Sequence, residues 1–229
     1  MKILNRNYFS KAEITLWVFS VAIITGVFLW FDRNNYITLI ASLIGVTSLI
    51  YNAKGNPFGL VLMILFSILY GIISFSFAYY GEMITYIGMT MPMSAIALVS
   101  WLKNPYKEDR SEVAVNKISL KEIIFMLLLA VPVTVVFYFI LKVFNTANLS
   151  LSTVSVTTSF IAVYLTFRRS PYYAIGYALN DIVLIVLWIL ASVENIAYIS
   201  VTVCFVIFLV NDLYGFLCWR KMEKRQLNG

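Results

Sequence analysis

The feature that most constrains this chain is a series of eight apolar segments, each about as long as a membrane-spanning helix. A helix needs about 20 apolar residues to cross a hydrocarbon core about 30 Å thick. The predicted spans cover residues 14–31, 36–52, 57–79, 83–102, 119–144, 151–167, 171–191 and 196–219. Composition agrees, because only 12% of the residues are charged, about half the usual share in a soluble domain. The sequence therefore predicts an all-α membrane protein with eight transmembrane helices.

The residue content narrows the functional classes. Histidine is absent, and the two cysteines, Cys204 and Cys218, lie in one apolar segment. We therefore expect no metal site, no cofactor and no histidine-based catalysis. The net charge of +6 comes from basic residues spread over the gaps between the spans, which argues against nucleic acid as a partner. An intramembrane enzyme stays as an alternative function, although the sequence offers no catalytic set for one.

The basic residues lie mostly on one side of the predicted membrane. When the spans alternate in direction, 15 of the 17 lysines and arginines fall on the side that holds both termini, and only Arg33 and Lys142 fall opposite. Cytoplasmic loops of membrane proteins carry the excess of basic residues. We therefore expect both termini and the polar 103–118 loop to lie in the cytoplasm.

The chain also contains a weak internal repeat. Lys54 and Pro57 recur as Arg168 and Pro171, both displaced by 114 residues, and the tripeptide Trp-Leu-Lys at 101–103 resembles Trp-Arg-Lys at 219–221. The repeating unit is three helices, and a single linker helix between the copies makes them parallel, as in SWEET-type transporters. The substrate site of such transporters lies between the triplets, near the middle of the membrane.

This repeat predicts a division of the chain into six parts. They are an N-terminal transmembrane helix (1–35), a first three-helix repeat (36–102), a cytoplasmic loop (103–118), a linker helix (119–150), a second three-helix repeat (151–219) and a cytoplasmic tail (220–229).

Two carboxyl groups inside the spans mark the candidate site, because a carboxylate within a bilayer costs several kcal/mol unless it is paired or hydrated. Asp181 lies ten residues after Pro171, which is about 15 Å along a helix and so near the midplane. Asp212 lies eight residues before Arg220, about 12 Å from the cytoplasmic end. Either carboxyl could instead be structural, with Asp181 bonded to a neighbouring helix and Asp212 reaching water or a C-terminal arginine.

One face of the seventh span combines aromatic and hydrogen-bonding groups, which suits a ring-bearing solute with hydroxyls. The candidate substrate ligands are Tyr173, Tyr177, Asn180, Asp181 and Trp188 in that span, Asn211 and Asp212 in the eighth, and Tyr70 and Tyr86 in the third and fourth. Tyr173 could instead belong to an interfacial aromatic belt. Trp101 and Trp219 are expected to be belt residues rather than ligands.

Three local patterns make the chain resemble the PnuC family of bacterial vitamin-precursor transporters, whose founding substrate is nicotinamide riboside. They are Asn180 in the helix after the basic turn Arg168-Arg169, Asn211 followed eight residues later by Trp219, and Tyr79-Tyr80-Gly81-Glu82 at the start of the fourth span. The resemblance implies a multi-pass protein of the bacterial inner membrane that works by facilitated diffusion with alternating access. It also implies a cytoplasmic kinase that traps the substrate, and assembly as a homotrimer.

Departures from the family pattern leave the substrate open. The tryptophans expected four and seven residues before Asn180 are Gly176 and Tyr173, and the glutamine expected near the start of the fourth span is Tyr86. Thiamine, riboflavin, a deoxynucleoside and a proton-coupled mechanism therefore remain alternatives. We expect Asn180 and Asp181 to face the cavity between the triplets and bind the ribose-like part of the substrate, with aromatic side chains around its ring.

Overall fold

The computed structural model describes residues 8–76 and 79–228. Its elements in chain order are α1 (Lys11–Phe31), α2 (Tyr36–Ala53), α3 (Phe58–Ser76), α4 (Tyr80–Thr85), the π-helical segment η1 (Tyr86–Thr90), α5 (Met91–Lys103), β1 (Pro105–Tyr106), β2 (Asp109–Val113), α6 (Leu120–Val143), α7 (Leu149–Phe167), α8 (Tyr173–Glu194), the short 3₁₀ segment η2 (Ile196–Tyr198) and α9 (Ile199–Asn228). Among the described residues, eight helical stretches are long and apolar enough to cross a membrane, and α4, η1 and α5 together form one of them. The predicted number of spans is thus confirmed.

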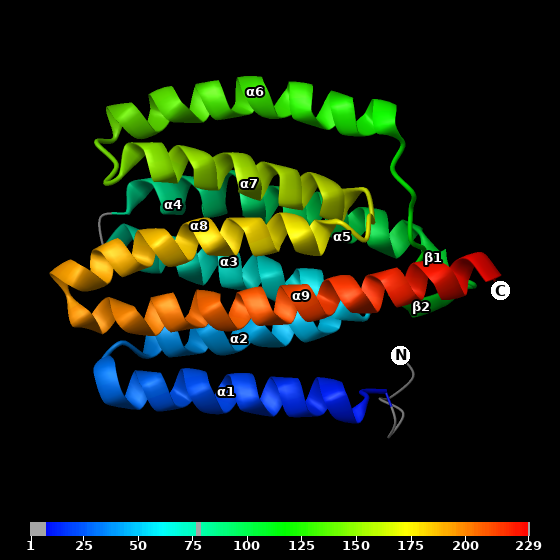
Figure 1. Cartoon of the computed structure of the whole chain (residues 1–229), viewed down its shortest axis with the longest axis horizontal. Coiled ribbons are helices and arrows are strands. Elements are labelled where there is room, and N and C mark those ends of the chain that lie inside the picture. Colours follow the sequence, from blue (N-terminus) through cyan, green and yellow to red (C-terminus); the bar gives the residue numbers. More distant parts are fainter. Residues whose placement is uncertain (1–7, 77–78, 229) are drawn as a thin grey trace.

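The helices lie side by side, with their long axes in nearly the same direction (Figure 1). We call α2, α3 and α4–α5 the first triplet, and α7, α8 and α9 the second triplet. The two triplets close into a ring, because α9 packs on α2 and α5 packs on α7. Outside this ring, α1 lies against α2 and α9 at one edge, and α6 lies against α7 at the opposite edge (Figure 1).

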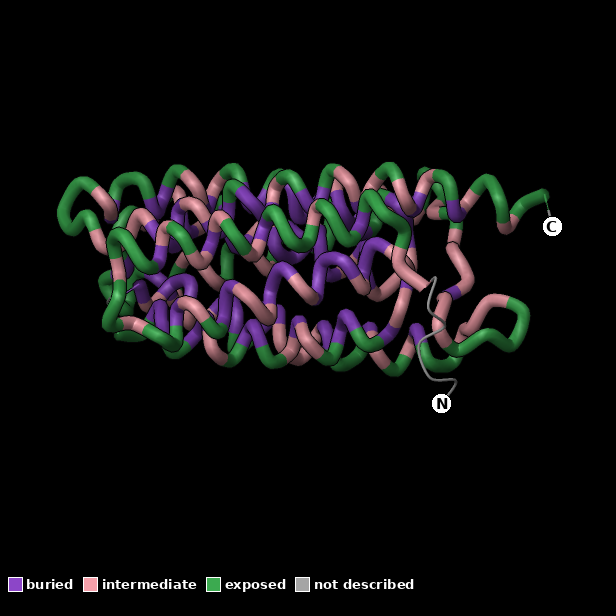
Figure 2. Tube along the Cα trace, turned by 90° about the horizontal axis from the view of Figure 1, so that it is seen from below, coloured by how far each residue is buried: buried purple, intermediate pink, exposed green. Residues whose placement is uncertain are grey.

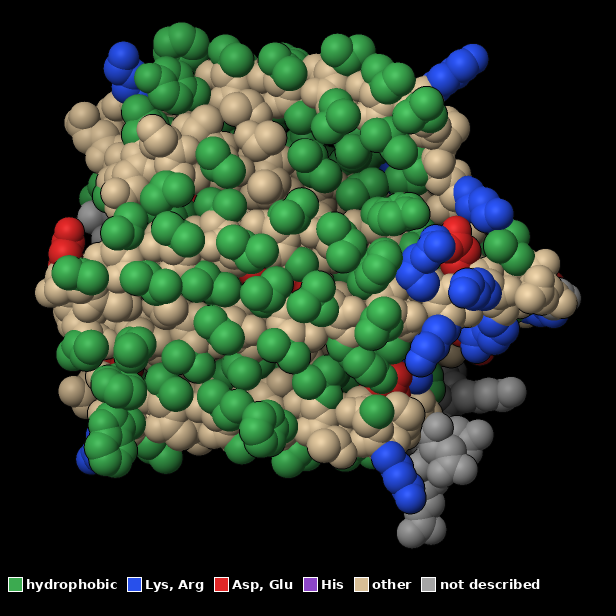
Figure 3. All heavy atoms as spheres, in the orientation of Figure 1, with side chains coloured by type: hydrophobic (Ala, Val, Ile, Leu, Met, Phe, Trp, Pro, Cys, Tyr) green, Lys and Arg blue, Asp and Glu red, His purple; other side chains and the backbone are tan. Residues whose placement is uncertain are grey.

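The start of α1 and the end of α9 lie at the same end of the bundle, which we call the terminal end; the opposite end is the far end (Figure 1). The antiparallel β1–β2 hairpin also lies at the terminal end. Figure 2 shows buried residues inside the bundle and exposed ones on its outer faces and on the hairpin. On the face drawn in Figure 3, most lysine and arginine side chains gather at the terminal end, while apolar side chains cover the length of the helices. This surface is suited to contact with lipid.

Local sequence explains how the helices begin and turn. Ser10 and Glu13 form a capping box at the start of α1, in which the Ser10 hydroxyl accepts from the Glu13 backbone N–H at 3.2 Å. Gly55, between α2 and α3, has a φ of 66°, which glycine adopts without strain. Arg169 has a φ of 56° in the turn between α7 and α8. The two basic turns of the sequence repeat therefore share a left-handed residue.

Most helix ends lie within a few residues of the predicted boundaries, and two of the differences bear on the function. α9 continues to Asn228, so residues 220–228 of the predicted tail are helical. An ion pair between Arg220 and Glu223 at 2.5 Å supports this extension, and neither Pro nor Gly interrupts it. α4 begins at Tyr80 rather than at 83, which places Glu82 inside the span.

The two prolines within the spans have different surroundings. Pro92 directly follows the π-helical segment η1, whereas Pro132 lies inside α6. Proline lacks a backbone donor and its ring crowds the carbonyl four residues earlier. A π-helical turn is one way for a helix to accommodate such a disturbance, so the irregularity of the fourth span lies directly before Pro92.

The expectation that Trp101 and Trp219 are belt residues is wrong. Both side chains are fully buried. The Trp101 indole N–H donates to the backbone carbonyl of Thr166 at 2.9 Å, and that of Trp219 donates to the carbonyl of Asn52 at 2.7 Å. The two rings lie 5.3 Å apart. The sequence placed both tryptophans near the terminal end but did not indicate which way their side chains point. Both indoles point inward and join one triplet to the other at that end.

Candidate functional site

The face of α8 that the sequence singled out is the buried face of that helix. Its candidate residues are Tyr173, Tyr177, Asn180, Asp181 and Trp188, all buried. Their neighbours differ, because α8 packs between α7 and α9 and also reaches the first triplet through Trp188. One helical face therefore serves several contacts, and each residue has to be placed separately.

Asn180 is held against α7. Its side-chain carbonyl accepts hydrogen bonds from the hydroxyls of Thr158 at 2.8 Å, Ser159 at 2.9 Å and Ser155 at 3.4 Å. Three donors satisfy this buried oxygen well. The Asn180 carbonyl therefore belongs to the contact within the second triplet.

Glu82 is a buried carboxyl that the sequence interpretation did not include among the ligands. Its side chain is 0% exposed, and one carboxyl oxygen accepts from Ser155 at 3.4 Å. The other oxygen has no hydrogen-bond partner among the described residues. Because Ser155 also donates to Asn180, this serine lies between the polar group of α4 and that of α8. The residue was missed because the predicted span began at 83, which left Glu82 in the adjoining loop.

Asp181 and Asp212 lie next to each other, a contact that the sequence interpretation did not include. The rings of Tyr173 and Trp219 lie 5.0 Å apart and fix the register of the antiparallel α8 and α9. Asp181 is eight residues beyond Tyr173 and Asp212 is seven residues before Trp219, so both lie about 11–12 Å further into the bundle. Their carboxyl groups are within hydrogen-bonding reach of each other.

The carboxyl pair has aromatic neighbours. Tyr86 and Tyr177 both lie close enough to Asp181 to interact with it electrostatically. Asp181 and Asp212 are each 3% exposed, and the Asp181 Oδ2 atom has no hydrogen-bond partner among the described residues. The structure thus brings together four of the predicted ligands, from η1, α8 and α9, around the Asp181–Asp212 carboxyl pair.

Tyr70 and Trp188 join the two triplets nearer the far end. The Trp188 indole N–H donates to the Tyr70 hydroxyl at 2.7 Å, and both side chains are buried. Tyr86 contacts Tyr70 with ring centroids 4.4 Å apart, and Tyr79 contacts Trp188 at 5.0 Å. These rings form an aromatic cluster that also receives Phe205 of α9.

Asn211 and Tyr173 lie apart from these groups. The Asn211 amide donates to the Ser20 hydroxyl of α1 at 3.1 Å, so this candidate faces the N-terminal helix. Tyr173 is buried against Trp219 and its hydroxyl approaches Gly215. The alternative that Tyr173 is an interfacial belt residue is therefore wrong.

Two cavities lie away from these candidates. A cavity of about 500 Å³ opens at the terminal end and is lined by charged side chains that include Glu13, Lys54 and Arg225. A second, of about 280 Å³, lies between α1 and α2. None of the nine candidate residues lines either one. The candidate residues other than Tyr173 and Asn211 instead form a layer of buried polar and aromatic groups inside the ring of helices, which we call the mid-bundle layer.

Comparison with known proteins agrees with this architecture. The nicotinamide mononucleotide transporter family matches residues 35–221. A curated relative, the nicotinamide riboside transporter PnuC of Neisseria mucosa, is 23% identical over 215 residues, which cover 92% of this chain and 81% of the relative. The crystal structure of the vitamin B3 transporter PnuC superposes with a TM-score of 0.83 at 22% identity, over 95% of this chain and 94% of that one.

These matches confirm the resemblance to PnuC transporters that the sequence patterns indicated. The relatives are transporters rather than enzymes, and with the apolar spans they identify a multi-pass membrane protein. Because the family match extends over most of the chain, this protein belongs to the nicotinamide mononucleotide transporter family.

Proposed function

We propose that this protein carries nicotinamide riboside, or a related nucleoside-like vitamin precursor, across the bacterial inner membrane by facilitated diffusion with alternating access. The observation that carries the proposal is the buried Asp181 carboxyl, which keeps one oxygen without a partner among the described residues. A carboxylate so far from water needs a compensating group. The cationic pyridinium of nicotinamide riboside would supply one, and the name of the Neisseria mucosa relative favours the same substrate.

The proposed binding site is the mid-bundle layer together with Tyr173 and Asn211, which lie next to it on α8 and α9. Asp181 and Asn180 bind the ribose-like and cationic parts of the substrate, and Tyr173, Tyr177 and Trp188 provide aromatic surface around the ring. Tyr70, Tyr86, Asn211 and Asp212 complete the set of ligands. Substrate entry requires the layer to open, because these side chains now contact one another. The three hydroxyls on the Asn180 carbonyl support a second role for this residue, which is to hold α7 against α8.

The two triplets act as parallel repeats that rock about the substrate. The crossed indole bonds support this arrangement, because Trp101 donates to α7 whereas Trp219 donates to α2. The donors are 118 residues apart and the acceptors, Thr166 and Asn52, are 114 residues apart, which are the displacements of the sequence repeat. On this division residues 36–102 and 151–219 are the repeats, 1–35 the N-terminal helix, 103–118 a loop, 119–150 the linker and 220–229 the C-terminal extension.

The terminal end faces the cytoplasm. The uneven distribution of basic residues supports this orientation, although Lys2 and Arg6 lie outside the described residues. Cysteines introduced at 107 and 224 should resist a membrane-impermeant thiol reagent added to intact cells, whereas a cysteine in the 145–150 turn should react. Labelling at 107 and 224 with a silent 145–150 turn would reverse the topology.

Two partners complete the proposed function. A cytoplasmic kinase phosphorylates the imported nucleoside, and the added charge prevents its return through the membrane. The transporter assembles as a homotrimer in the lipid bilayer. Light scattering of the purified protein in detergent tests the trimer, and uptake in cells that lack the kinase tests the trapping step, because accumulation should then stop at the external concentration.

Transport by the isolated protein is the direct test of the proposed function. Liposomes that contain the purified protein should equilibrate labelled nicotinamide riboside without ATP. Thiamine, riboflavin and a deoxynucleoside serve as competitors, and whichever solute is carried fastest is the substrate. Equal entry into protein-free liposomes would reject the proposal, and so would activity that needs an added ATP-driven partner.

The Asp181–Asp212 contact favours one variant of this function, which is coupling to protons. Two carboxyl groups form a hydrogen bond with each other only when one of them holds a proton. A substrate cation that displaced this proton would exchange for it during transport. A pH-sensitive dye trapped in the liposomes should then report proton movement that accompanies uptake. Uptake without any dye response would reject proton coupling and support facilitated diffusion.

A further inference from the structure

The longest polar loop of the chain is a strap that bonds to both triplets. We call residues 104–116, which include the β1–β2 hairpin, the strap. On the side of the first triplet, the Val113 backbone N–H donates to the carbonyl of Gly55 at 2.9 Å, in the turn between α2 and α3. Val113 is fully buried, and its side chain fills the space beside Gly55, where an added Cβ would lie 3.3 Å from it. The Ala114 backbone N–H also donates to the carbonyl of Asn104, at the end of α5, at 2.9 Å. The strap therefore links the α2–α3 turn to the end of α5.

The strap bonds to the second triplet mainly through one amide side chain. The Gln226 carbonyl accepts from the Val115 backbone N–H at 2.8 Å, and the Gln226 amide donates to the Val113 carbonyl at 3.0 Å. This side chain therefore pairs with the strap as a neighbouring strand would. The same amide donates to Glu112 at 2.7 Å, and Asn116 adds a backbone bond to Arg169 at 3.0 Å.

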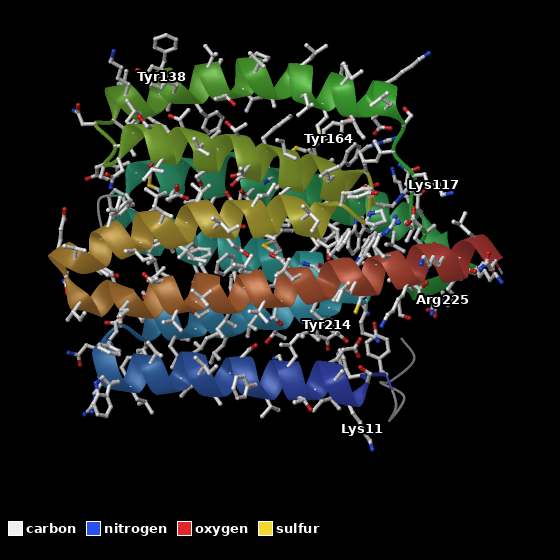
Figure 4. All side chains as sticks on the ribbon, in the orientation of Figure 1. Lys11, Lys117, Tyr138, Tyr164, Tyr214 and Arg225 are labelled. Carbon is white, nitrogen blue, oxygen red and sulfur yellow. The ribbon has the colours of Figure 1, made fainter. Side chains whose placement is uncertain are left out.

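An ion pair reinforces this contact. Arg225, which projects from the end of α9 beside the hairpin (Figure 4), contacts Glu112 at 2.5 Å. The Arg225 side chain is 60% exposed, so water and salt weaken the pair. Gln226 is also partly exposed. Water can therefore replace the bonds from the strap to α9, whereas the bond from Val113 to Gly55 is a backbone bond next to a fully buried side chain.

From this asymmetry we propose that the strap is a latch for the terminal end: it stays on the first triplet and releases Gln226 and Arg225 of α9 when that end opens. The proposal rests on the proposed transport function, because only a transporter with alternating access must separate its triplets at this end. A strap that is bonded to α9 opposes movement of the terminal end of that helix away from the first triplet. It parts from α9 at its weakest bonds, those to Gln226 and Arg225, while the backbone bond from Asn116 keeps it on Arg169 in the α7–α8 turn.

Opening can be measured without substrate by the distance between two spin labels. The labels are placed at Lys103→Cys on α5 and Lys221→Cys on α9, both exposed positions, in a chain with Cys204→Ser and Cys218→Ser. Gln226→Ala removes the amide bonds, and Lys224→Ala is the matched control, because Lys224 is exposed on the same stretch of α9. We expect Gln226→Ala to raise the ratio of the population at the longer distance to the population at the shorter distance about tenfold, the factor given by 1.4 kcal/mol. Lys224→Ala should leave this ratio unchanged.

A second variant and a second readout make the result decisive. Glu112→Ala removes the acceptor of both α9 side chains from the strap and should shift the distances in the same direction. Hydrogen exchange of a peptide that covers 104–116 should become faster in both variants. Unchanged distances in Gln226→Ala and Glu112→Ala would overturn the latch, as would an equal shift in Lys224→Ala. Absence of nicotinamide riboside uptake by the parent protein would reject the proposed function instead, since the distances are measured without substrate.

Discussion

The terminal end and the far end of the bundle both join the first triplet to the second, but through different groups. At the terminal end, two buried indoles donate to backbone carbonyls across the triplets, and the strap adds bonds to α9. Nearer the far end, two side-chain bonds join the described helices of the two triplets. Trp188 donates to Tyr70 at 2.7 Å among aromatic rings, and Ser155 of α7 donates to Glu82 of α4 at 3.4 Å.

This difference teaches which end opens more readily. Rings can slide past one another with little loss of contact, whereas a buried indole that leaves its carbonyl loses a hydrogen bond outright. Separation of the triplets at the far end therefore disrupts fewer bonds. If the terminal end is cytoplasmic, the resting protein opens first toward the outside, which is the side from which an uptake transporter receives its substrate.

The largest expected effect is at the terminal end. Trp219→Ala and Trp101→Ala should each lower the free energy of unfolding by about 3–5 kcal/mol, because a fully buried aromatic side chain is removed. Thermal unfolding in detergent measures the loss. Trp30→Ala, at a side chain that is 78% exposed, should change little. Equal effects at Trp30 and Trp219 would remove the distinction between inward and lipid-facing tryptophans.

A smaller effect tests how closely the second triplet is packed near the terminal end. A Cβ on Gly176 would lie 2.9 Å from the Cα atom of Ala162, so Gly176→Ala should push α8 from α7 and cost about 1–3 kcal/mol. Gly26 has nothing within 4 Å of its added Cβ, and Gly26→Ala should be neutral or slightly stabilising. Equal melting temperatures for the two variants would contradict the close contact.

The smallest of these effects is at the aromatic cluster. Tyr70→Phe keeps the ring but removes the acceptor of the Trp188 N–H, which should cost about 1 kcal/mol and favour opening at the far end. Tyr138→Phe, on the outer helix α6 (Figure 4), is the control. A spin-label distance across the far end should lengthen in Tyr70→Phe alone. If Tyr70→Phe instead lengthened a spin-label distance across the terminal end, the two ends would not open independently as proposed.

The sequence was sufficient for the spans and for the buried face of α8. Apolar length predicts a span directly, and a helical period of 3.6 residues groups Tyr177, Asp181 and Trp188 on one face without any knowledge of neighbouring helices. Such patterns depend only on a single helix. They are therefore visible in one sequence.

The sequence was not sufficient for contacts that depend on two helices. Asp181 and Asp212 meet only because α8 and α9 have a particular antiparallel register, which the Tyr173–Trp219 contact reveals. The same limit applies to Trp101, whose depth is readable but whose direction is not. Glu82 was missed for a simpler reason, since a charged residue at a span boundary shortens the predicted span.

The central claim is that the Asp181 carboxyl in the mid-bundle layer recognises a cationic substrate. Calorimetric binding of nicotinamide riboside and of an uncharged deoxynucleoside to the parent protein and to Asp181→Asn tests it, with Glu108→Gln on the exposed hairpin as the control. We predict that Asp181→Asn weakens nicotinamide riboside more than tenfold, or about 1.4 kcal/mol, and affects the deoxynucleoside much less. Unchanged affinity for nicotinamide riboside in a folded Asp181→Asn variant would contradict the claim and leave Asp181 a structural residue.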